Sequence, residues 1–275
     1  MKLRLVAVPT LILLFAPAAV AATAWSNFHD SFDALPVGQT IGVADPANWR
    51  EFLSTPGLTL ASAPGGGLAL SDSPAAEPGT QSRSDRTVGL LDAGTVYEFG
   101  FRARASTTNP GSDAYFFVKR DLINGYTFSL GIANGQIQFG GDATCGTSGS
   151  GTQLTAPALP DTWYQFVVHY EVREGLADDE ITVYYRAEGD PQLTELGTLC
   201  SYTDDLHLDG AVDNVALGFV RPANTALDGN FLDDFYGRAI LPTQAIPALD
   251  AAGVVALALA LAAAAALAIR RRRPA

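Results

Sequence analysis

The sequence predicts an all-β body, built as a two-sheet antiparallel sandwich, between two apolar terminal segments. Three observations predict this. Short runs in which apolar and polar residues alternate fill the middle of the chain, where a helical period is almost absent. Asn-Gly pairs, which favour tight turns, separate some of these runs. Both ends of the 275-residue chain instead carry apolar stretches beside clusters of cations.

Alternation is clearest in three runs, each of which predicts a strand with one face in a core and the other toward solvent. In the first run Tyr97, Phe99 and Phe101 alternate with polar or small residues. The other two runs are 164–172 and 181–185.

Two Asn-Gly pairs, at 124–125 and 134–135, predict hairpins, because both central residues of a type I′ turn need positive φ. They join the runs 115–118, 126–132 and 136–139 into a meander. The remaining expected strands are 28–32, 49–53, 58–61, 67–70, 87–91, 215–220 and 231–238. About a dozen short strands with one helical turn are best buried as two stacked antiparallel sheets.

The N-terminal segment, residues 1–22, has the three-part layout of a secretory signal peptide. Lys2 and Arg4 supply positive charge, an apolar stretch follows, and small residues cluster around Ala21 and Ala24. An uncleaved membrane anchor is the alternative. We predict cleavage after Ala21 or Ala24, and therefore an exported chain.

The C-terminal run 251–269 is wholly apolar, and as a helix of 19 residues it would span roughly 28 Å, close to the thickness of a hydrocarbon core. The cluster Arg270 to Arg273 follows and stays cytoplasmic by the positive-inside rule. A globular helix would need a polar face, which this run lacks. We predict a transmembrane helix that leaves the body outside the membrane.

The segment 243–275 contains, in order, a short motif, the apolar helix and the Arg cluster. The motif is Ile246-Pro247-Ala248-Leu249-Asp250-Ala251-Ala252-Gly253. This order resembles the bacterial IPTL-CTERM sorting signal, a relative of the PEP-CTERM signals that exosortase-type transpeptidases handle. Ile246, Pro247, Leu249 and Gly253 match the usual motif, whereas Ala248, Asp250, Ala251 and Ala252 replace its Thr, Ser, Glu and Trp. The resemblance implies that the helix is removed when the body is transferred to the cell surface; a permanent anchor is the alternative.

Four segments of the body carry a family resemblance. They are the opening Phe28-His29-Asp30-Ser31-Phe32-Asp33, the run Tyr126-Thr127-Phe128-Ser129-Leu130 followed by Ile137-Gln138-Phe139, the hairpin from 162–168 to 181–185, and the closing Phe231-Leu232-Asp233-Asp234-Phe235. On these residues the segment 23–242 resembles the concanavalin A-like, laminin-G-like jelly roll. The resemblance implies an all-β, two-sheet antiparallel jelly-roll sandwich, with another β-sandwich as the alternative. Because this fold hosts lectins, glycosidases and polysaccharide lyases, it does not decide the function.

Charge and cysteine content narrow the function further. The chain has 17 cations and 29 acids, and since six cations lie at the two ends, the middle carries 11 cations against all 29 acids. So acidic a surface repels phosphate backbones, and we expect no nucleic-acid partner. Cys145 and Cys200 are the only cysteines, and an even count in an exported chain predicts a disulfide. Metal binding would need more ligands than two thiols.

Sequence motifs for catalysis are absent. Retaining glycosidases need two carboxylates about 5 Å apart, yet Glu98 and Glu171 stand alone on their expected strands. The dense acidic run 178–180 is typical of a solvated hairpin loop. Neither a Gly-x-Ser-x-Gly elbow nor a His-Glu-x-x-His motif occurs. We therefore expect no enzymatic activity, with a site assembled from distant loops as the alternative.

Carbohydrate binding has more support, because a pyranose has an apolar face for aromatic rings and polar edges for planar hydrogen-bonding groups. Such side chains share the outward face of two expected strands: Trp163, Gln165 and His169 on one, and Tyr184 and Arg186 on the next. Arg102 and Arg104 would extend this surface. An ordinary solvated sheet face is the alternative.

The resemblance to the jelly roll implies a second site, for a structural calcium ion, because jelly rolls of this kind often hold one near the first and last strands. Calcium is the one cofactor that the sequence suggests, and four aspartates lie near those strands. They are Asp30, Asp33, Asp233 and Asp234, with Asp234 the preferred ligand, and hard oxygen ligands suit this ion. An acidic surface without an ion is the alternative.

Together these features predict an exported bacterial protein, anchored in the membrane at first and then sorted to the cell surface or extracellular matrix. Its jelly-roll domain is predicted to bind carbohydrate or another matrix polymer without altering it. The alternatives are a secreted glycoside hydrolase or polysaccharide lyase, and a purely structural matrix protein. The expected partners are an exosortase-type transpeptidase, a polysaccharide or matrix glycan, and the membrane.

Overall fold

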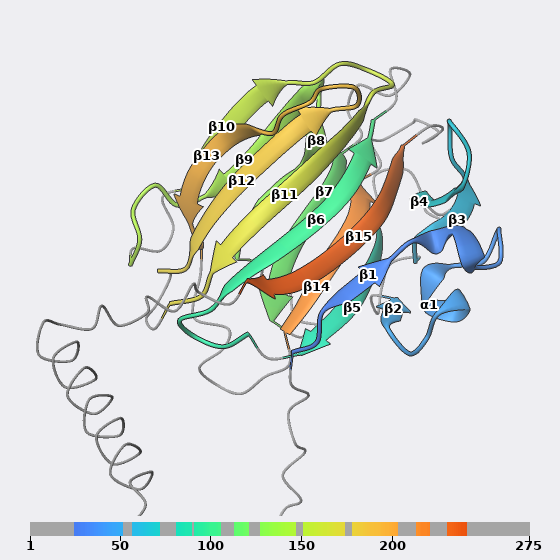
Figure 1. Ribbon diagram of the computed structural model, residues 1–275, viewed down its shortest axis with the longest axis horizontal. Helices are drawn as coiled ribbons and strands as arrows, with labels where there is room; N and C mark the ends of the chain where they lie inside the picture. The colour runs from blue at the N-terminus through green and yellow to red at the C-terminus, as the bar shows by residue number, and fades with distance from the viewer. Residues whose placement is uncertain are drawn as a thin grey trace, which may run out of the picture.

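The computed structural model contains two antiparallel β-sheets that form two layers (Figure 1). It describes residues 25–51, 57–71, 81–89, 91–105, 113–120, 127–146, 151–173, 178–202, 213–220 and 230–240. Within these ranges there are fifteen strands, one 3₁₀ turn and one α-helical turn. The predicted all-β, two-sheet architecture is therefore confirmed.

The first sheet has the order β13-β12-β11-β6-β15-β4-β3, and β1 also pairs with β15. Its strands are β1 Phe28–Asp30, β3 Thr59–Ser62, β4 Leu68–Ser71, β6 Val96–Arg104, β11 Trp163–Glu171, β12 Glu180–Ala187, β13 Thr194–Cys200 and β15 Phe231–Ile240. The second sheet has the order β10-β9-β8-β7-β14-β5-β2. Its strands are β2 Trp49–Glu51, β5 Gln81–Gly89, β7 Asp113–Arg120, β8 Ser129–Ala133, β9 Gln136–Gly141, β10 Thr152–Pro157 and β14 Asp213–Val220.

The chain crosses repeatedly from one sheet to the other. The last two strands are each inserted between earlier ones, since β14 lies between β7 and β5, and β15 lies between β6 and β4. The β15 strand shares its outer edge between two partners, β4 at its beginning and β1 farther along. Segments far apart in sequence thus depend on each other for their hydrogen bonds.

The core lies between the sheets and is rich in aromatic rings. Phe101 of β6 and Phe166 of β11 are stacked, with ring centroids 5.0 Å apart, and both are buried. Leu130 and Phe139 enter the same cluster from the second sheet. The apolar residues of the predicted alternating runs are thus the ones that point into this core.

The Asn134-Gly135 turn has the conformation that the sequence predicted. Asn134 and Gly135 have φ of 51° and 72° and join β8 to β9. The other Asn-Gly pair, at 124–125, lies outside the described residues. The first expected strand ends early, at Asp30, because the chain turns into η1 (Phe32–Ala34) and buries Phe32 against Trp49.

Two strands, β10 and β13, were not predicted, and β5 begins at Gln81 rather than at residue 87. Both missed strands lie at sheet edges and have exposed polar residues, so they carry little apolar alternation. The first half of β5 is polar on both faces, yet it is buried: Ser82, Arg83, Ser84, Asp85 and Arg86 are each at most 7% exposed. The first half of β5 therefore lacks the apolar alternation by which the other strands were predicted, because its buried side chains are polar.

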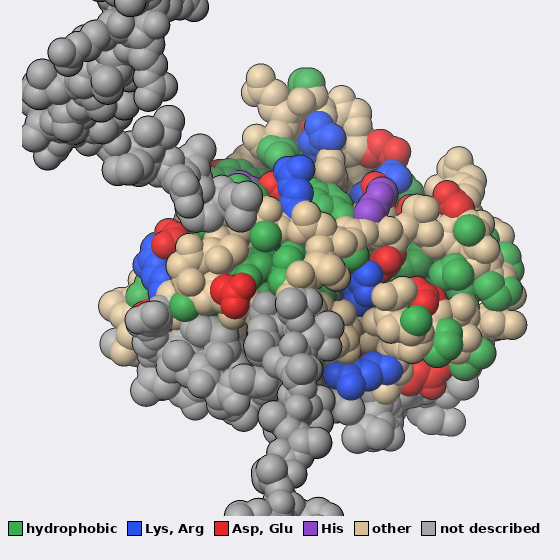
Figure 2. All heavy atoms as spheres, turned by 60° about the horizontal axis from the view of Figure 1, so that its bottom comes forward, with side chains coloured by type: hydrophobic (Ala, Val, Ile, Leu, Met, Phe, Trp, Pro, Cys, Tyr) green, Lys and Arg blue, Asp and Glu red, His purple; other side chains and the backbone are tan. Residues whose placement is uncertain are grey.

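Charge on the outer faces is balanced locally. Figure 2 shows basic and acidic side chains interspersed on one face of the molecule. Near the end of β11, Arg173 pairs with Glu171 at 3.2 Å and with Glu180 at 3.0 Å. Such pairs neutralise opposite charges locally.

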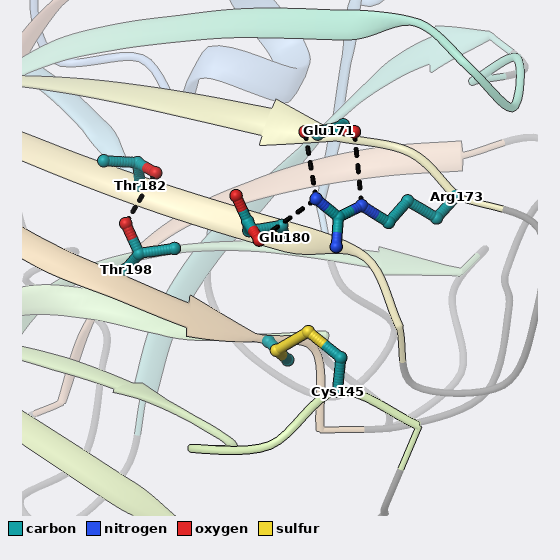
Figure 3. Close-up of a disulfide and its surroundings, with 7 residues drawn as sticks. Cys145, Glu171, Arg173, Glu180, Thr182 and Thr198 are labelled. Carbon is teal, nitrogen blue, oxygen red and sulfur yellow. Dashed lines mark hydrogen bonds and ion pairs between the residues drawn. A yellow bond between two sulfur atoms is a disulfide. The ribbon is translucent and has the colours of Figure 1, made fainter.

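The predicted disulfide between Cys145 and Cys200 is confirmed (Figure 3). Cys200 ends β13, and its backbone exchanges two hydrogen bonds of 2.8 Å with Asp142, which follows β9. Because β13 and β9 belong to different sheets, the disulfide ties the two layers together near one edge of the sandwich.

The two ends of the described body lie side by side. Trp25 packs on Tyr97 at the start of β6, with ring centroids 4.6 Å apart, and Ile240 pairs with Val96 there. The predicted signal peptide (1–22) and sorting segment (243–275) lie outside the described residues. The helices that the structure does describe are too short to span a bilayer.

Removal of the disulfide tests how far it stabilises the fold. The double variant Cys145→Ser/Cys200→Ser is expected to lose about 4 kcal/mol of unfolding free energy, because the link closes a loop with a sequence separation of 55. Urea unfolding with and without a thiol reductant measures this. The reductant should leave the double variant unchanged, and a wild-type chain equally stable in both conditions would contradict the assignment.

Candidate functional site

The outward face of the first sheet holds a row of three planar polar side chains. Gln165 on β11 stands opposite Arg102 on β6 and opposite Arg186 on β12. Residues directly opposite in an antiparallel pair share a face. Arg102, Gln165 and Arg186 therefore lie in a line across three adjacent strands, as the alternation predicted.

This row borders a groove of about 290 Å³. One wall is the turn after β12, residues 187–190, where Gly189 has φ of +94°. The turn is held in place because the Glu188 amide donates to the Trp163 carbonyl at 2.8 Å, and the Asp190 amide donates to the Ala187 carbonyl at 3.0 Å. The groove thus combines a rigid sheet surface with an ordered turn.

Trp163 lies in the groove but is not the exposed aromatic platform that was predicted. It is only 6% exposed, because it packs on Phe231 and because the Arg102 guanidinium lies 4.8 Å from its ring centroid. Its indole N–H donates to the Pro64 carbonyl at 3.4 Å. The indole is therefore covered by a cation rather than open for stacking with a ligand.

The two groove arginines differ in their partners. Arg102 pairs with Glu188 at 3.3 Å and lies 4.0 Å from Asp233. Arg186 donates from Nε to the Gln165 Oε1 at 2.8 Å. Among the residues that the structure describes, no carboxylate lies within ion-pair distance of Arg186.

His169 and Tyr184 belong to a second cluster on the same face, farther along the strands. His169 is four residues beyond Gln165, roughly 13 Å along β11. Its ring contacts Tyr184, with centroids 5.2 Å apart, and its Nε2 lies 3.2 Å from Glu98 Oε2. The structure therefore divides the five predicted binding residues between a groove and a separate carboxylate cluster.

Glu98 is the centre of that cluster. It is 6% exposed and accepts hydrogen bonds from Arg238 at 2.7 Å and from the Tyr236 hydroxyl at 3.1 Å, besides its contact with His169. Burial alone raises the pKa of Glu98, but the bonds and the charge of Arg238, helped by Tyr236 and His169, bring the pKa below its usual 4.5. Burial and the adjacent carboxylate raise the pKa of Tyr236 to about 12. The cluster is thus a satisfied carboxylate and its donors.

Arg104, which was expected to extend the surface, lies beside the groove. Its Nη2 is 2.7 Å from the Asp161 Oδ1, and its Nε donates to the Asp161 carbonyl at 3.2 Å. Both contacts tie the end of β6 to the loop before β11.

The four predicted calcium ligands are divided among separate contacts. Asp30 accepts from the Trp49 indole at 3.1 Å and pairs with Arg86 at 2.9 Å. Asp33 accepts from the Leu68 amide at 2.7 Å. In the described part of the chain no group of three His, Cys, Asp or Glu side chains is placed to hold a metal ion.

The other two aspartates flank an irregularity in β15. Asp234 has φ of 56° and lies 2.7 Å from His29 Nε2, which links β15 to β1. Burial raises the pKa of Asp233, and the nearby charges of Asp234 and Asp33 add to that rise. The described geometry thus offers no shared oxygen cage, and calcium at this edge stays a prediction.

The turn residues Glu188, Gly189 and Asp190 are the part of the groove that the sequence did not reveal. Their signal was a Glu-Gly-Asp turn directly after an alternating strand. It was missed because β13, the strand that the turn leads to, lacks apolar alternation.

No protein-family model matches the sequence, and no curated protein sequence matches it. Solved structures that resemble the fold include an engineered GH43 glycoside hydrolase with endo-xylanase and exo-arabinofuranosidase activity, at 15% identity and a TM-score of 0.49. That match covers 78% of this chain and 41% of the hydrolase chain, so this chain spans less than half of it.

Two further matches each cover 78% of this chain. One is a protein of unknown function from Shewanella oneidensis MR-1, at 18% identity and a TM-score of 0.49 over 87% of its length. The other is lectin II from Ulex europaeus, at 12% identity and a TM-score of 0.47 over 99% of its length. The activities in these descriptions belong to those proteins.

The Glu98 cluster predicts a specific dependence of stability on pH. Glu98→Gln is expected to lower the unfolding free energy by about 2 kcal/mol at pH 7, since the carboxylate accepts charge-assisted hydrogen bonds. Because the pKa of Glu98 is lower in the folded state than the usual 4.5, its stabilisation is present above that value and is lost as the pH falls through the folded pKa. The difference between the two proteins should therefore shrink toward pH 3.

Urea unfolding at a series of pH values measures this difference. Glu195→Gln, a change at an exposed residue of β13, is the matched control. A Glu98→Gln effect of equal size at pH 7 and pH 3 would show that the charge of Glu98 does not stabilise the fold.

Proposed function

We propose that this is an exported, surface-sorted protein whose sandwich binds carbohydrate in the groove between β6, β11, β12 and the turn at 187–190, without altering the sugar. The observation that carries this proposal is the row of Arg102, Gln165 and Arg186 along the groove. Guanidinium and amide groups are planar donors and acceptors that suit the hydroxyl groups around the edge of a sugar ring.

The size and composition of the groove fit this role. A volume of about 290 Å³ lies at the small end of ligand pockets, which is the scale of one or two sugar rings. Since Arg102 covers the Trp163 ring, hydrogen bonds rather than stacking would provide most of the contact. Such a site suits repeated weak binding along a polymer, where several copies act together.

The carboxylates of the groove support binding rather than catalysis. Glu188 is exposed and pairs with Arg102, and Asp190 is exposed on the turn. A general acid in a glycosidase is usually sheltered from water, which keeps it protonated. Glu98, the most buried of the described carboxylates on this face, is occupied by its own donors outside the groove. Asp233, whose pKa is raised by burial, lies 4.0 Å from Arg102 but does not line the groove.

The position of the groove supports surface display. Trp25 and Ile240 lie beside the start of β6, whereas Arg102 lies six residues farther along it, roughly 20 Å away. A body tethered through the chain after Ile240 would present the groove away from its attachment. The disulfide fits an oxidising, extracytoplasmic compartment. We assign the sorting step to an exosortase-type enzyme acting on 243–275.

Binding is tested with the full-length chain on an array of polysaccharides and glycans, with and without calcium. We expect retention of a glycan without release of product. Gln165→Ala should weaken it about tenfold, because the variant removes one polar contact and frees the Arg186 side chain. Gln138→Ala on β9, in the other sheet, is the matched control.

Each other outcome selects an alternative. Release of shortened glycan would make the protein a hydrolase or lyase. Calcium-dependent retention would assign an ion to the region of Asp234. A folded chain that retains no glycan would rule out carbohydrate binding and leave a structural role.

The sorting proposal is tested by substitution of the motif. In bacteria that carry an exosortase-type enzyme, Ile246→Ala/Pro247→Ala should keep the body in the membrane fraction, because the motif is what such an enzyme is expected to recognise. The control is Thr243→Ala, which lies before the motif. Equal release of both variants, measured by fractionation and immunoblotting, would contradict the resemblance.

A further inference from the structure

We propose that the groove selects an acidic sugar, and that the guanidinium of Arg186 binds its carboxylate. This inference rests on the proposed carbohydrate-binding function and names the class of glycan. The observation behind it is that the other described arginines on this face of the sheet pair with carboxylates, whereas Arg186 does not.

Three other arginines on the face each have a carboxylate partner. Arg102 pairs with Glu188, Arg104 with Asp161 at 2.7 Å, and Arg238 with Glu98 at 2.7 Å. Within the described residues Arg186 has no such partner, although acids outnumber cations in the chain by 29 to 17. A partner from outside the chain would complete the pattern.

The one contact that Arg186 does make prepares it for a carboxylate. Its Nε donates to Gln165 Oε1 at 2.8 Å, which holds the guanidinium by one edge. The two terminal nitrogens retain four N–H donors. Paired N–H groups in this planar arrangement match the two oxygens of a carboxylate, and holding them in advance lowers the entropy lost on binding.

Neighbouring groups would contact the rest of the same sugar. Gln165 is opposite both arginines, so its amide nitrogen and Arg102 are available for hydroxyl groups on the ring. The row spans two strand spacings, roughly 10 Å, a length suited to a disaccharide. Arg186 would thus bind the carboxylate of the sugar, while Gln165 and Arg102 would bind the hydroxyl groups of its ring.

The charged side chains around the groove limit how many anionic groups of a ligand it can bind. Glu188 and Asp233 offset the charge of Arg102, and Asp190 is exposed on the rim. Arg186 therefore supplies the one cation in the groove that is not already balanced by a described carboxylate. Such a groove favours a single carboxylate and repels a densely sulfated chain.

The test uses the full-length chain and matched polymers. Alginate, hyaluronan and polygalacturonate are each compared with their carboxyl-reduced forms, beside heparin and a panel of neutral polysaccharides. We expect at least one acidic polymer to bind about tenfold tighter than its reduced form, and heparin to bind no better than that polymer.

Variants assign the preference to Arg186. Arg186→Gln should abolish the difference between the acidic and reduced forms, and Arg186→Lys should retain part of it, since lysine keeps the charge but not the planar pair of donors. Arg173→Gln removes the same charge at the other end of β11 and should leave the preference unchanged. Unfolding midpoints confirm that each variant is folded.

The outcomes separate this inference from the function on which it rests. Retention of neutral glycans alone, or an acidic preference that survives in Arg186→Gln, overturns the inference and leaves carbohydrate binding standing. Tightest binding to heparin would overturn the single-carboxylate site. A folded wild-type chain that binds no polymer at all would remove the proposed function together with the inference.

Discussion

The strict two-residue period of β6 is the constraint on which both the core and the groove depend. Tyr97, Phe99, Phe101 and Ala103 point into the space between the sheets, so the residues that alternate with them, Glu98 and Arg102 included, must face outward. Pairing with β11 on one side and β15 on the other holds this register along the strand. A slip by one residue would bury the groove residues and expose the aromatic core.

Buried charge is the second determinant of the arrangement. Asp30 of β1 and Arg86 of β5 form an ion pair between the two sheets, and Arg86 also lies 4.0 Å from the centroid of the Phe28 ring. Burial is the main reason that the pKa of Asp30 is raised and that of Arg86 lowered. Since desolvation offsets much of the attraction, the pair is better understood as fixing where β1 docks than as a large source of stability.

A glycine separates the groove from the Glu98 cluster. Gly100 lies between Glu98 and Arg102 on the outward face of β6, and the Tyr236 ring occupies the space where its side chain would be. Any larger residue would displace Tyr236 and with it one donor to Glu98. The same sheet face can therefore hold a satisfied carboxylate and, a few residues farther along β6, the groove that Arg102 lines.

The order of residues along the chain was enough to predict strands, outward-facing residues, the Asn134-Gly135 turn and the disulfide, because each depends on local period, turn chemistry or cysteine count. It was not enough for β5, where Arg83 pairs with Asp85 of the same strand and Arg86 with the distant Asp30, or for the edge strand β13. Nor did it reveal that Arg102 covers Trp163, or that His169 joins Glu98 instead of the groove. Those contacts depend on which strands become neighbours in the sheets. The alternation of apolar and polar residues within one strand does not determine which strands pair with it.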